Sequence, residues 1–433
     1  MEKELFYTIL AREMQLATGC TEPGAIALCG AYAGAELAKL GEPLVRMEIN
    51  CSTNIIKNAM AAGIPGTNYA GIAYAAAIGA VRAQPQRQLE VINQVPQELY
   101  QAAEALVQQG LVKMGHADVP QKLYIEAICY SENHRARAVI ADKHTNLILT
   151  EADGKLLYSA ADGETAAAPT GKAASPELTI RSIYDFCTKE MDPINGPIDM
   201  VRQAVSVNSR ICDEGLKTTY GLGIGPGLAA DCEKGYMTRD MVTDAMIITT
   251  AGVDARMAGA PFSVVANTGS GNQGIAATMP VVALARWNKI PEDKMLRAVA
   301  LSNLVVMRIK AKFGRLSALC GATVATTGAC CGITYLLGGT YEDICCAIHN
   351  MIGNVAGMLC DGAKHDCALK ISTCVNAAFQ AALMALRGVR VQSTDGIVEQ
   401  DVERTIDNFA QLGNKGSGPM DEAMLHMMLN KCS

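Results

Sequence analysis

Residues 316–341 form a stretch of 26 residues without a charged side chain. This length would suffice to cross a bilayer, but the stretch holds five glycines, five threonines and few large aliphatic side chains. We therefore expect a buried segment that neighbouring backbone approaches closely, inside a large soluble protein. Half of the 433 residues are apolar and 18% are charged, which predicts a sizeable core spread over two or three domains.

The charge balance excludes several classes of partner. The 37 basic and 43 acidic side chains give a net charge of −6. This balance provides no basic face for nucleic acid or anionic lipid, so we expect neither a nucleic-acid nor a membrane partner, whereas a small anionic metabolite is compatible with it. The first 14 residues carry five charged side chains and no apolar leader, which predicts a cytoplasmic protein.

The chain contains sixteen cysteines. In a long intracellular protein thiols stay reduced, so these cysteines are buried small hydrophobes, redox groups or metal ligands. Helices rich in glycine and alanine favour, in addition, a homodimer.

Hydrophobic periodicity divides the chain into two parts. Residues 1–158 predict an N-terminal part that continues into a small α/β unit. Residues 159–176 are rich in Ala, Gly, Thr, Ser and Pro, which is typical of a linker. Residues 177–433 are mainly helical. The predicted fold class is therefore α+β, with a predominantly helical catalytic core built from N-terminal and C-terminal helices and a smaller α/β domain.

Local patterns predict the individual elements of the N-terminal part. Strands are expected over residues 44–51, 89–95, 122–130, 137–141 and 146–150, and helices over residues 6–41 with a break at 18–24, over 69–82 and over 96–109.

Three cysteines, Cys320, Cys360 and Cys367, are separated by 40 and 7 residues. We expect a helix over residues 343–359 to end at Cys360, with Gly362 as its stop, and the next helix to begin at Cys367. Such a pair of helices brings both sulfurs to one end, where the helix N-terminus favours thiolates. Three thiolates can hold a [4Fe–4S] cluster with one open iron, which is a Lewis acid.

Two other interpretations of these cysteines remain open. A zinc ion is one, although the chain has neither a C-x-x-C pair nor two histidines four residues apart. Simple burial of three small apolar side chains is the other.

A fourth cysteine, Cys20, precedes Pro23 in a turn before a predicted helix. The helix N-terminus lowers the pKa of a thiol, so Cys20 could act as a base or as an additional sulfur ligand. Alternatively, Thr21 caps the helix and Cys20 only packs.

Two polar segments could bind a small anion. The segment after the strand over residues 44–51 offers hydroxyl, amide and ammonium groups for a carboxylate. The glycine-rich turn over residues 267–274 offers backbone N–H groups for an anion nest. The side chains and backbone singled out are Ser52, Thr53, Asn54 and Lys57 in the first segment, and Ser270, Gly271 and Asn272 in the second.

Together, in this order, these motifs resemble the iron–sulfur L-serine dehydratase alpha-chain superfamily. Within it the chain is most similar to the L-cysteine desulfidase branch and to a protein family of unassigned activity in the same group. The resemblance covers nearly the whole chain. It is carried by residues 20–23, 52–54, 57–58, 63–66 and 269–274 and by Cys320, Cys360 and Cys367.

The resemblance implies β-elimination from a small L-amino acid without pyridoxal phosphate, converting L-cysteine to pyruvate, ammonia and sulfide. It implies a [4Fe–4S] cluster on the three cysteines, whose open iron is easily lost in air, and Cys20 as the base. It also implies that the two polar segments orient the substrate.

The chain departs from the superfamily in two respects. Serine dehydratases typically have a histidine in the glycine-rich turn, where this chain has Gln273, which weakens a preference for serine. Those enzymes can also carry a terminal cysteine that reaches the site, whereas Cys432 is the penultimate residue here; it is a candidate for that role or an ordinary tail thiol.

Three different functions stay open beside this one. They are an L-serine dehydratase of the same superfamily, a pyridoxal phosphate lyase with Lys57 as the Schiff-base lysine, and a non-catalytic iron–sulfur redox sensor.

Overall fold

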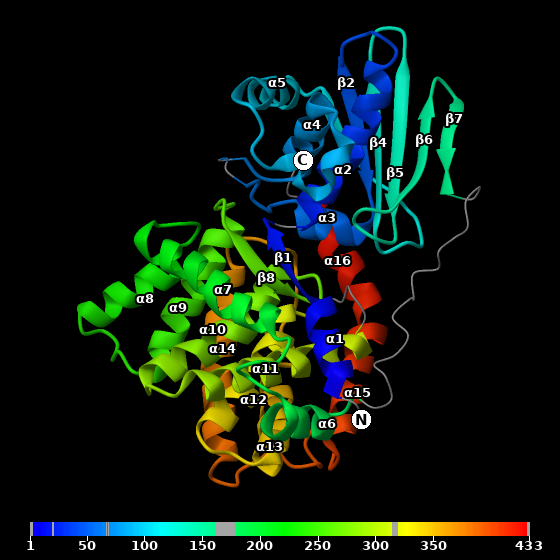
Figure 1. Cartoon of the computed structure of the whole chain (residues 1–433). Helices are drawn as coiled ribbons and strands as arrows, with labels where there is room; N and C mark the ends of the chain where they lie inside the picture. Colours follow the sequence, from blue (N-terminus) through cyan, green and yellow to red (C-terminus); the bar gives the residue numbers. More distant parts are fainter. Residues whose placement is uncertain are drawn as a thin grey trace.

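The computed structural model describes residues 3–19, 21–65, 67, 69–160, 178–313 and 319–430 (Figure 1). It is mostly helical with a six-stranded mixed sheet, which confirms the α+β class. Cys20, nearly all of the predicted linker, and Cys432 lie outside the described residues.

The first half of the chain contains all strands but one. Its elements are α1 (Lys3–Glu13), β1 (Met14–Thr18), α2 (Thr21–Ala38), β2 (Arg46–Cys51), α3 (Thr53–Ala59), α4 (Ile72–Arg82), the 3₁₀ helix η1 (Pro85–Ile92), α5 (Gln97–Gln108), β3 (Val112–His116), β4 (Tyr124–Tyr130), β5 (Arg135–Ala141), β6 (Leu147–Ala152) and β7 (Lys155–Ser159).

The second half is almost entirely helical. Its elements are α6 (Ile180–Asp185), the π-helix η3 (Phe186–Glu190), α7 (Asp199–Lys217), α8 (Ile224–Glu233), α9 (Met241–Met257), β8 (Ser263–Asn267), α10 (Gly271–Trp287), α11 (Glu292–Phe313), α12 (Gly321–Leu336), α13 (Tyr341–Val355), α14 (Cys367–Ala385), α15 (Val402–Lys415) and α16 (Ser417–Leu429).

The sheet runs in the order β3-β2-β4-β5-β6-β7, and only β2 and β3 are parallel to each other. Alternate residues of β2 are buried, because one face of the sheet packs on α2. Helices α2 and α4 approach closely through glycines. A Cβ on Gly79 would lie 1.9 Å from the Ala27 carbonyl oxygen, and one on Gly34 would lie 2.2 Å from that of Ala80. The helix pair therefore depends on these small residues.

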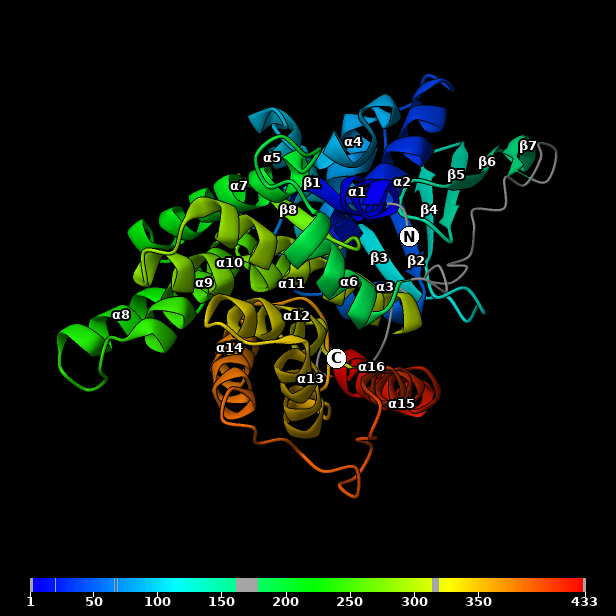
Figure 2. The same cartoon turned by 60° about the horizontal axis from the view of Figure 1, so that its bottom comes forward.

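Helix α12, which lies within the uncharged stretch, is at the centre of the helical part. It packs against α10, α11, α13 and α14, and almost all its residues are buried, as expected (Figure 2). A Cβ on Gly328 would lie 2.4 Å from the Ser302 carbonyl oxygen of α11. Among the described residues, α14 is the one helix long and apolar enough to cross a membrane by length and composition, and 56% of that span is buried inside the protein.

Two hydrophobic cores meet near the middle of the molecule. The first core contains α1 and the helices of the second half, and the second core contains α2, α4 and the sheet. Helix α16 bridges them, since it contacts α3 and α15 and places Leu425 in the second core (Figure 1). Strand β1 also connects distant parts, because it pairs with β8 from Met14↔Asn267 to Thr18↔Ser263.

The structure corrects several element predictions. The segment expected as a strand over residues 89–95 is largely η1, whose Val91 and Ile92 are buried against α2. Strands β1, β3 and β7 are absent from the sequence-based prediction. The partners of β1 and β3 lie far away in the chain, whereas β7 forms a hairpin with the adjacent strand β6. The helix predicted over residues 343–359 ends at Val355, since the next segment is extended.

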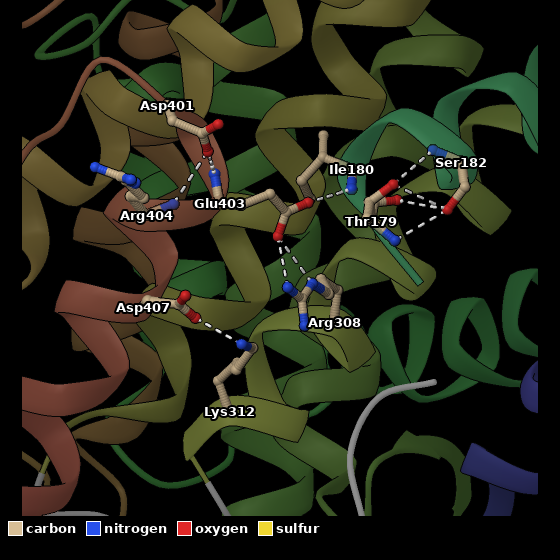
Figure 3. Close-up of polar contacts among 9 residues, drawn as sticks. All are labelled: Thr179, Ile180, Ser182, Arg308, Lys312, Asp401, Glu403, Arg404 and Asp407. Carbon is tan, nitrogen blue, oxygen red and sulfur yellow. Dashed lines mark hydrogen bonds and ion pairs between the residues drawn. The ribbon is translucent and has the colours of Figure 1, made fainter. Parts of the chain in front are cut away.

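The C-terminal helices are tied to α11 by ionic contacts (Figure 3). Glu403 of α15 accepts hydrogen bonds from both Arg308 Nε, at 3.0 Å, and Arg308 Nη2, at 2.6 Å. Its other oxygen accepts one from the Ile180 N–H at 2.7 Å, at the start of α6. The Arg308 side chain is 9% exposed, so Glu403 neutralises a nearly buried charge.

We expect Gly79→Ala to destabilise the protein by about 1–3 kcal/mol, because the new methyl group would overlap the Ala27 carbonyl group. Gly227→Ala in α8 is the control. A Cβ there meets no atom within 4 Å, so it should stabilise by up to about 1 kcal/mol. Urea unfolding measures both variants, and equal stability of the two would contradict the close packing of α2 and α4.

We expect Glu403→Gln to cost about 2 kcal/mol of unfolding free energy, because it leaves the Arg308 charge nearly buried and unpaired. The control on the same helix is Asp407→Asn. Asp407 pairs with Lys312 at 2.8 Å, but both side chains are exposed, so its loss should cost less than about 0.5 kcal/mol. Similar costs for the two variants, measured by chemical denaturation, would show that burial of the Arg308 pair is unimportant.

Candidate functional site

Two of the three cysteines, Cys320 and Cys367, lie at the starts of helices, and Cys360 lies in the loop between α13 and α14. Leu319 and Leu359 form an antiparallel bridge, and the Cys320 N–H donates to the Met358 carbonyl oxygen at 2.9 Å. This bridge sets Cys320, the N-cap of α12, beside Cys360. Cys367 is the first residue of α14, as predicted.

The sulfurs interact with one another. The Cys320 thiol donates a hydrogen bond to the Cys360 sulfur, which lowers the pKa of Cys360 and raises the pKa of Cys320. The negative charge of Cys367 also raises the pKa of Cys320. The Cys367 thiol donates to the Gly362 carbonyl oxygen at 3.7 Å, and its sulfur accepts from the Lys364 N–H at 3.5 Å. All three sulfurs therefore share one site.

The three thiols fit an iron–sulfur cluster chemically, because cysteine thiolates are the usual ligands of such clusters. Within the ranges that the structure describes, no group of three or more His, Cys, Asp or Glu side chains is arranged to hold a single metal ion. Two of the sulfurs also lie where helices begin, at the positive ends of the helix dipoles.

Lysine side chains surround the sulfurs. Lys57 of α3 is 2% exposed, and its Nζ lies 2.5 Å from Asp421 Oδ1 of α16. Its charge, and that of Lys370, help to lower the pKa of Cys360. Burial lowers the pKa of Lys310 to about 8, while the negative charge of Cys360 opposes this shift. The site is thus suited to anionic sulfur.

The segment after β2 contributes less to the site than expected. Ser52 is buried, donates to the Lys122 carbonyl oxygen at 2.9 Å and accepts from the Tyr124 N–H at 3.2 Å. These bonds commit its hydroxyl to the sheet. Thr53 shares a hydrogen bond of 3.0 Å with His116 Nε2, and Asn54 is half-buried on α3.

Lys57 is the residue of this segment that reaches the sulfurs, and the backbone explains why. A Cβ on Gly362 would lie 1.9 Å from the Lys57 carbonyl oxygen, so the loop between Cys360 and Cys367 lies directly against α3. Gly362 has a φ of +110°, which other residues rarely adopt.

The glycine-rich turn is strained. Ser270 and Asn267 exchange two backbone hydrogen bonds of 3.0 and 3.1 Å, and between them Thr268 has a φ of +48° and Gly269 one of +82°. A β-branched residue with positive φ is an outlier, and such strain concentrates at functional sites. Ser270 is the N-cap of α10, and its hydroxyl accepts from the Gln273 N–H at 3.4 Å.

This turn adjoins the sulfur site. The Gln273 side chain lies 3.3 Å from the position of a Cβ on Gly321, the residue after Cys320. On its other side, Thr21 donates to the Gly269 carbonyl oxygen at 3.5 Å. Asn58 donates to Glu22 at 3.4 Å, which connects the start of α2 to α3. Segments from distant parts of the chain therefore surround one site.

The structure adds four residues that the sequence did not indicate as site residues: Lys310, Lys370, Asp421 and Arg256. Arg256 donates to Asn272 Oδ1 at 2.9 Å and to the Gly19 carbonyl oxygen at 2.8 Å. Lys310 lies in a visibly cationic run, residues 308–315. Asp421 and Arg256 lie in ordinary helices, and no sequence signal distinguishes them.

Comparison with known proteins gives a consistent result. Residues 80–426 match the family model described as serine dehydratase alpha chain. A UPF0597 protein of Shewanella pealeana is 41% identical over 99% of this chain and 98% of its own length. UPF0597 proteins of Phocaeicola vulgatus and Oleidesulfovibrio alaskensis are 40% and 39% identical, over 99% and 98% of this chain and 98% of their own lengths.

Proposed function

The chain belongs to the serine dehydratase alpha chain family, and from that membership we propose that it is an iron–sulfur-dependent lyase acting on a small L-amino acid. The proposed reaction is β-elimination of L-cysteine to pyruvate, ammonia and sulfide. The observation that carries the proposal is the meeting of the three sulfurs beside the strained glycine-rich turn.

Cys320, Cys360 and Cys367 would hold a [4Fe–4S] cluster. When bound, its open iron supplies a Lewis acid for the substrate. Lys57 and Lys370 contribute positive charge beside the sulfurs. Asp421 holds the Lys57 side chain in place through an ion pair that is almost fully buried.

The elimination needs a base for the α-proton, and we assign this role to Cys20. This role comes from the family resemblance. The neighbours of Cys20 in the sequence, Gly19 and Thr21, contact Arg256 and the glycine-rich turn. Loss of the α-proton and of the β-thiolate gives aminoacrylate and hydrosulfide. Aminoacrylate then tautomerises to an imine, which takes up water and releases ammonia and pyruvate.

One feature favours L-cysteine over L-serine as substrate. Gln273 replaces a histidine of the serine enzymes, and an amide cannot accept the α-proton. The Gln273 side chain is 6% exposed and its Oε1 has no hydrogen-bond partner among the described residues, so it is available to a ligand.

A pyridoxal phosphate lyase and a redox sensor are less well supported. A pyridoxal phosphate enzyme needs a lysine that can attack the cofactor, whereas Lys57 Nζ is engaged in a buried ion pair with Asp421. A redox sensor has no need of a strained, glycine-rich anion nest beside its sulfurs.

We expect anaerobically reconstituted protein to bind about four irons per chain and to release sulfide and pyruvate from L-cysteine faster than it releases pyruvate from L-serine. Cys360→Ser and Cys367→Ser should each abolish iron binding and activity. Cys20→Ser should keep the iron and lose activity, because it removes only the base.

Cys331→Ser provides the matched control. This cysteine is buried in α12, and its thiol already donates to the Thr327 carbonyl oxygen at 3.3 Å, a bond that serine can make. Iron content and activity should therefore match the wild type. Full activity of iron-free Cys360→Ser protein would overturn the proposed function.

A further inference from the structure

Arg256, in the last turn of α9, is a buried cation with only neutral partners. It is 6% exposed, and its Nη1 and Nη2 donate to an amide and to a backbone carbonyl oxygen, those of Asn272 and Gly19. Its Nε has no hydrogen-bond partner, and no carboxylate of the described ranges forms an ion pair with it. A buried cation without an anion is costly, so the site is suited to receive one.

The guanidinium lies against the start of α10. A Cβ on Gly271 would be 2.3 Å from Arg256 Nε, so only glycine allows this contact. The first bond of the helix runs from the Gly274 N–H to the Ser270 carbonyl oxygen, and the Ser270 hydroxyl takes the Gln273 N–H. The N–H groups of Gly271 and Asn272 therefore have no partner within the helix.

Two sources of positive charge therefore lie side by side. The N-terminus of the 17-residue helix α10 carries a partial positive charge, and the Arg256 charge adds to it. A carboxylate has the geometry and charge to accept from both guanidinium and backbone N–H groups. Gln273 of the same helical turn lies beside Gly321, so an amino acid bound here by its carboxylate has its other atoms near Cys320.

We propose that Arg256 and the first turn of α10 bind the α-carboxylate of the substrate. The identity of the ligand rests on the proposed function. The anion site itself rests on the unpartnered guanidinium Nε and the open helix N-terminus.

Arg82 shows that an unpartnered Nε alone is not sufficient. It is 8% exposed, its Nη1 donates to the Val91 and Asn93 carbonyl oxygens, and its Nε also lacks a partner. However, Arg82 Nη1 faces two carbonyl oxygens at the C-terminal end of η1, whose partial negative charges oppose its own charge. Arg82 is therefore a matched control for loss of a buried arginine.

The test uses L-alanine, which has the α-carboxylate but no leaving group, and L-alaninamide, which lacks the carboxylate. Calorimetric titration of anaerobic holoenzyme should detect L-alanine and not L-alaninamide. Arg256→Met should weaken L-alanine binding and raise the KM for L-cysteine at least about tenfold, the range for a hydrogen bond to a charged group. Iron content should stay unchanged.

Two further variants separate recognition from folding. Gly271→Ala should cause the same loss of L-alanine binding, because the methyl group displaces the guanidinium while Arg256 remains. Arg82→Met should keep wild-type binding and KM. If thermal unfolding shows that Arg256→Met does not fold, the test relies on Gly271→Ala and Arg256→Lys. The Arg256→Lys variant should retain part of the affinity for L-alanine because lysine keeps the positive charge.

The outcomes distinguish this site from the proposed function. Arg256-dependent binding of L-alanine by protein that eliminates nothing would support the carboxylate site and reject the lyase activity. Sulfide release with wild-type KM in Arg256→Met and Gly271→Ala would keep the activity and overturn the carboxylate site. Failure of wild-type protein to bind L-alanine, or equal binding of L-alaninamide, would also overturn it.

Discussion

The candidate site depends on the antiparallel bridge between Leu319 and Leu359. Two short extended segments, one before α12 and one after α13, pair there and bring Cys320 next to Cys360. Neither segment contains many residues, so the helices behind them must hold the pairing in place. Helices α11, α13 and α14 do this by packing around α12, the uncharged helix.

Small residues make that packing possible. Glycines at the contacts between α2 and α4, between α11 and α12, and between α3 and the cysteine loop let backbones come closer than any side chain would allow. Glycines also position the functional groups. Gly271 leaves room for the Arg256 guanidinium at the N-terminus of α10, and Gly362 lets α3 pack against the loop that carries Cys360 and Cys367. Dispersion contacts between such close backbones compensate for the scarcity of large aromatic residues.

The fold class and the general place of the cysteines followed from the sequence, since helical periodicity and spacing are local properties. The contact that brings the sulfurs together could not be predicted from the sequence. The sequence predicts a helix that ends at Cys360, whereas α13 ends at Val355 and Leu359 forms a β-bridge with Leu319. Pairing between segments 40 residues apart leaves no local signal, and the same is true of β1 with β8.

Individual side chains at the site were predictable only in part. Ser52 has the right chemistry for a ligand, but its hydroxyl is used by the sheet. Arg256 looks like an ordinary C-terminal helix residue until its neighbours from two distant segments are known. Which polar groups keep a free bonding capacity is a property of tertiary contacts, and it cannot be read from residue type.

The salt bridge between Lys57 and Asp421 joins residues 364 positions apart. Because a chain is synthesised from its N-terminus, helix α3 emerges from the ribosome well before helix α16. Until α16 has emerged, the lysine beside Cys360 lacks its counter-charge and the second core lacks Leu425. Assembly of the sulfur site during synthesis therefore waits for α16.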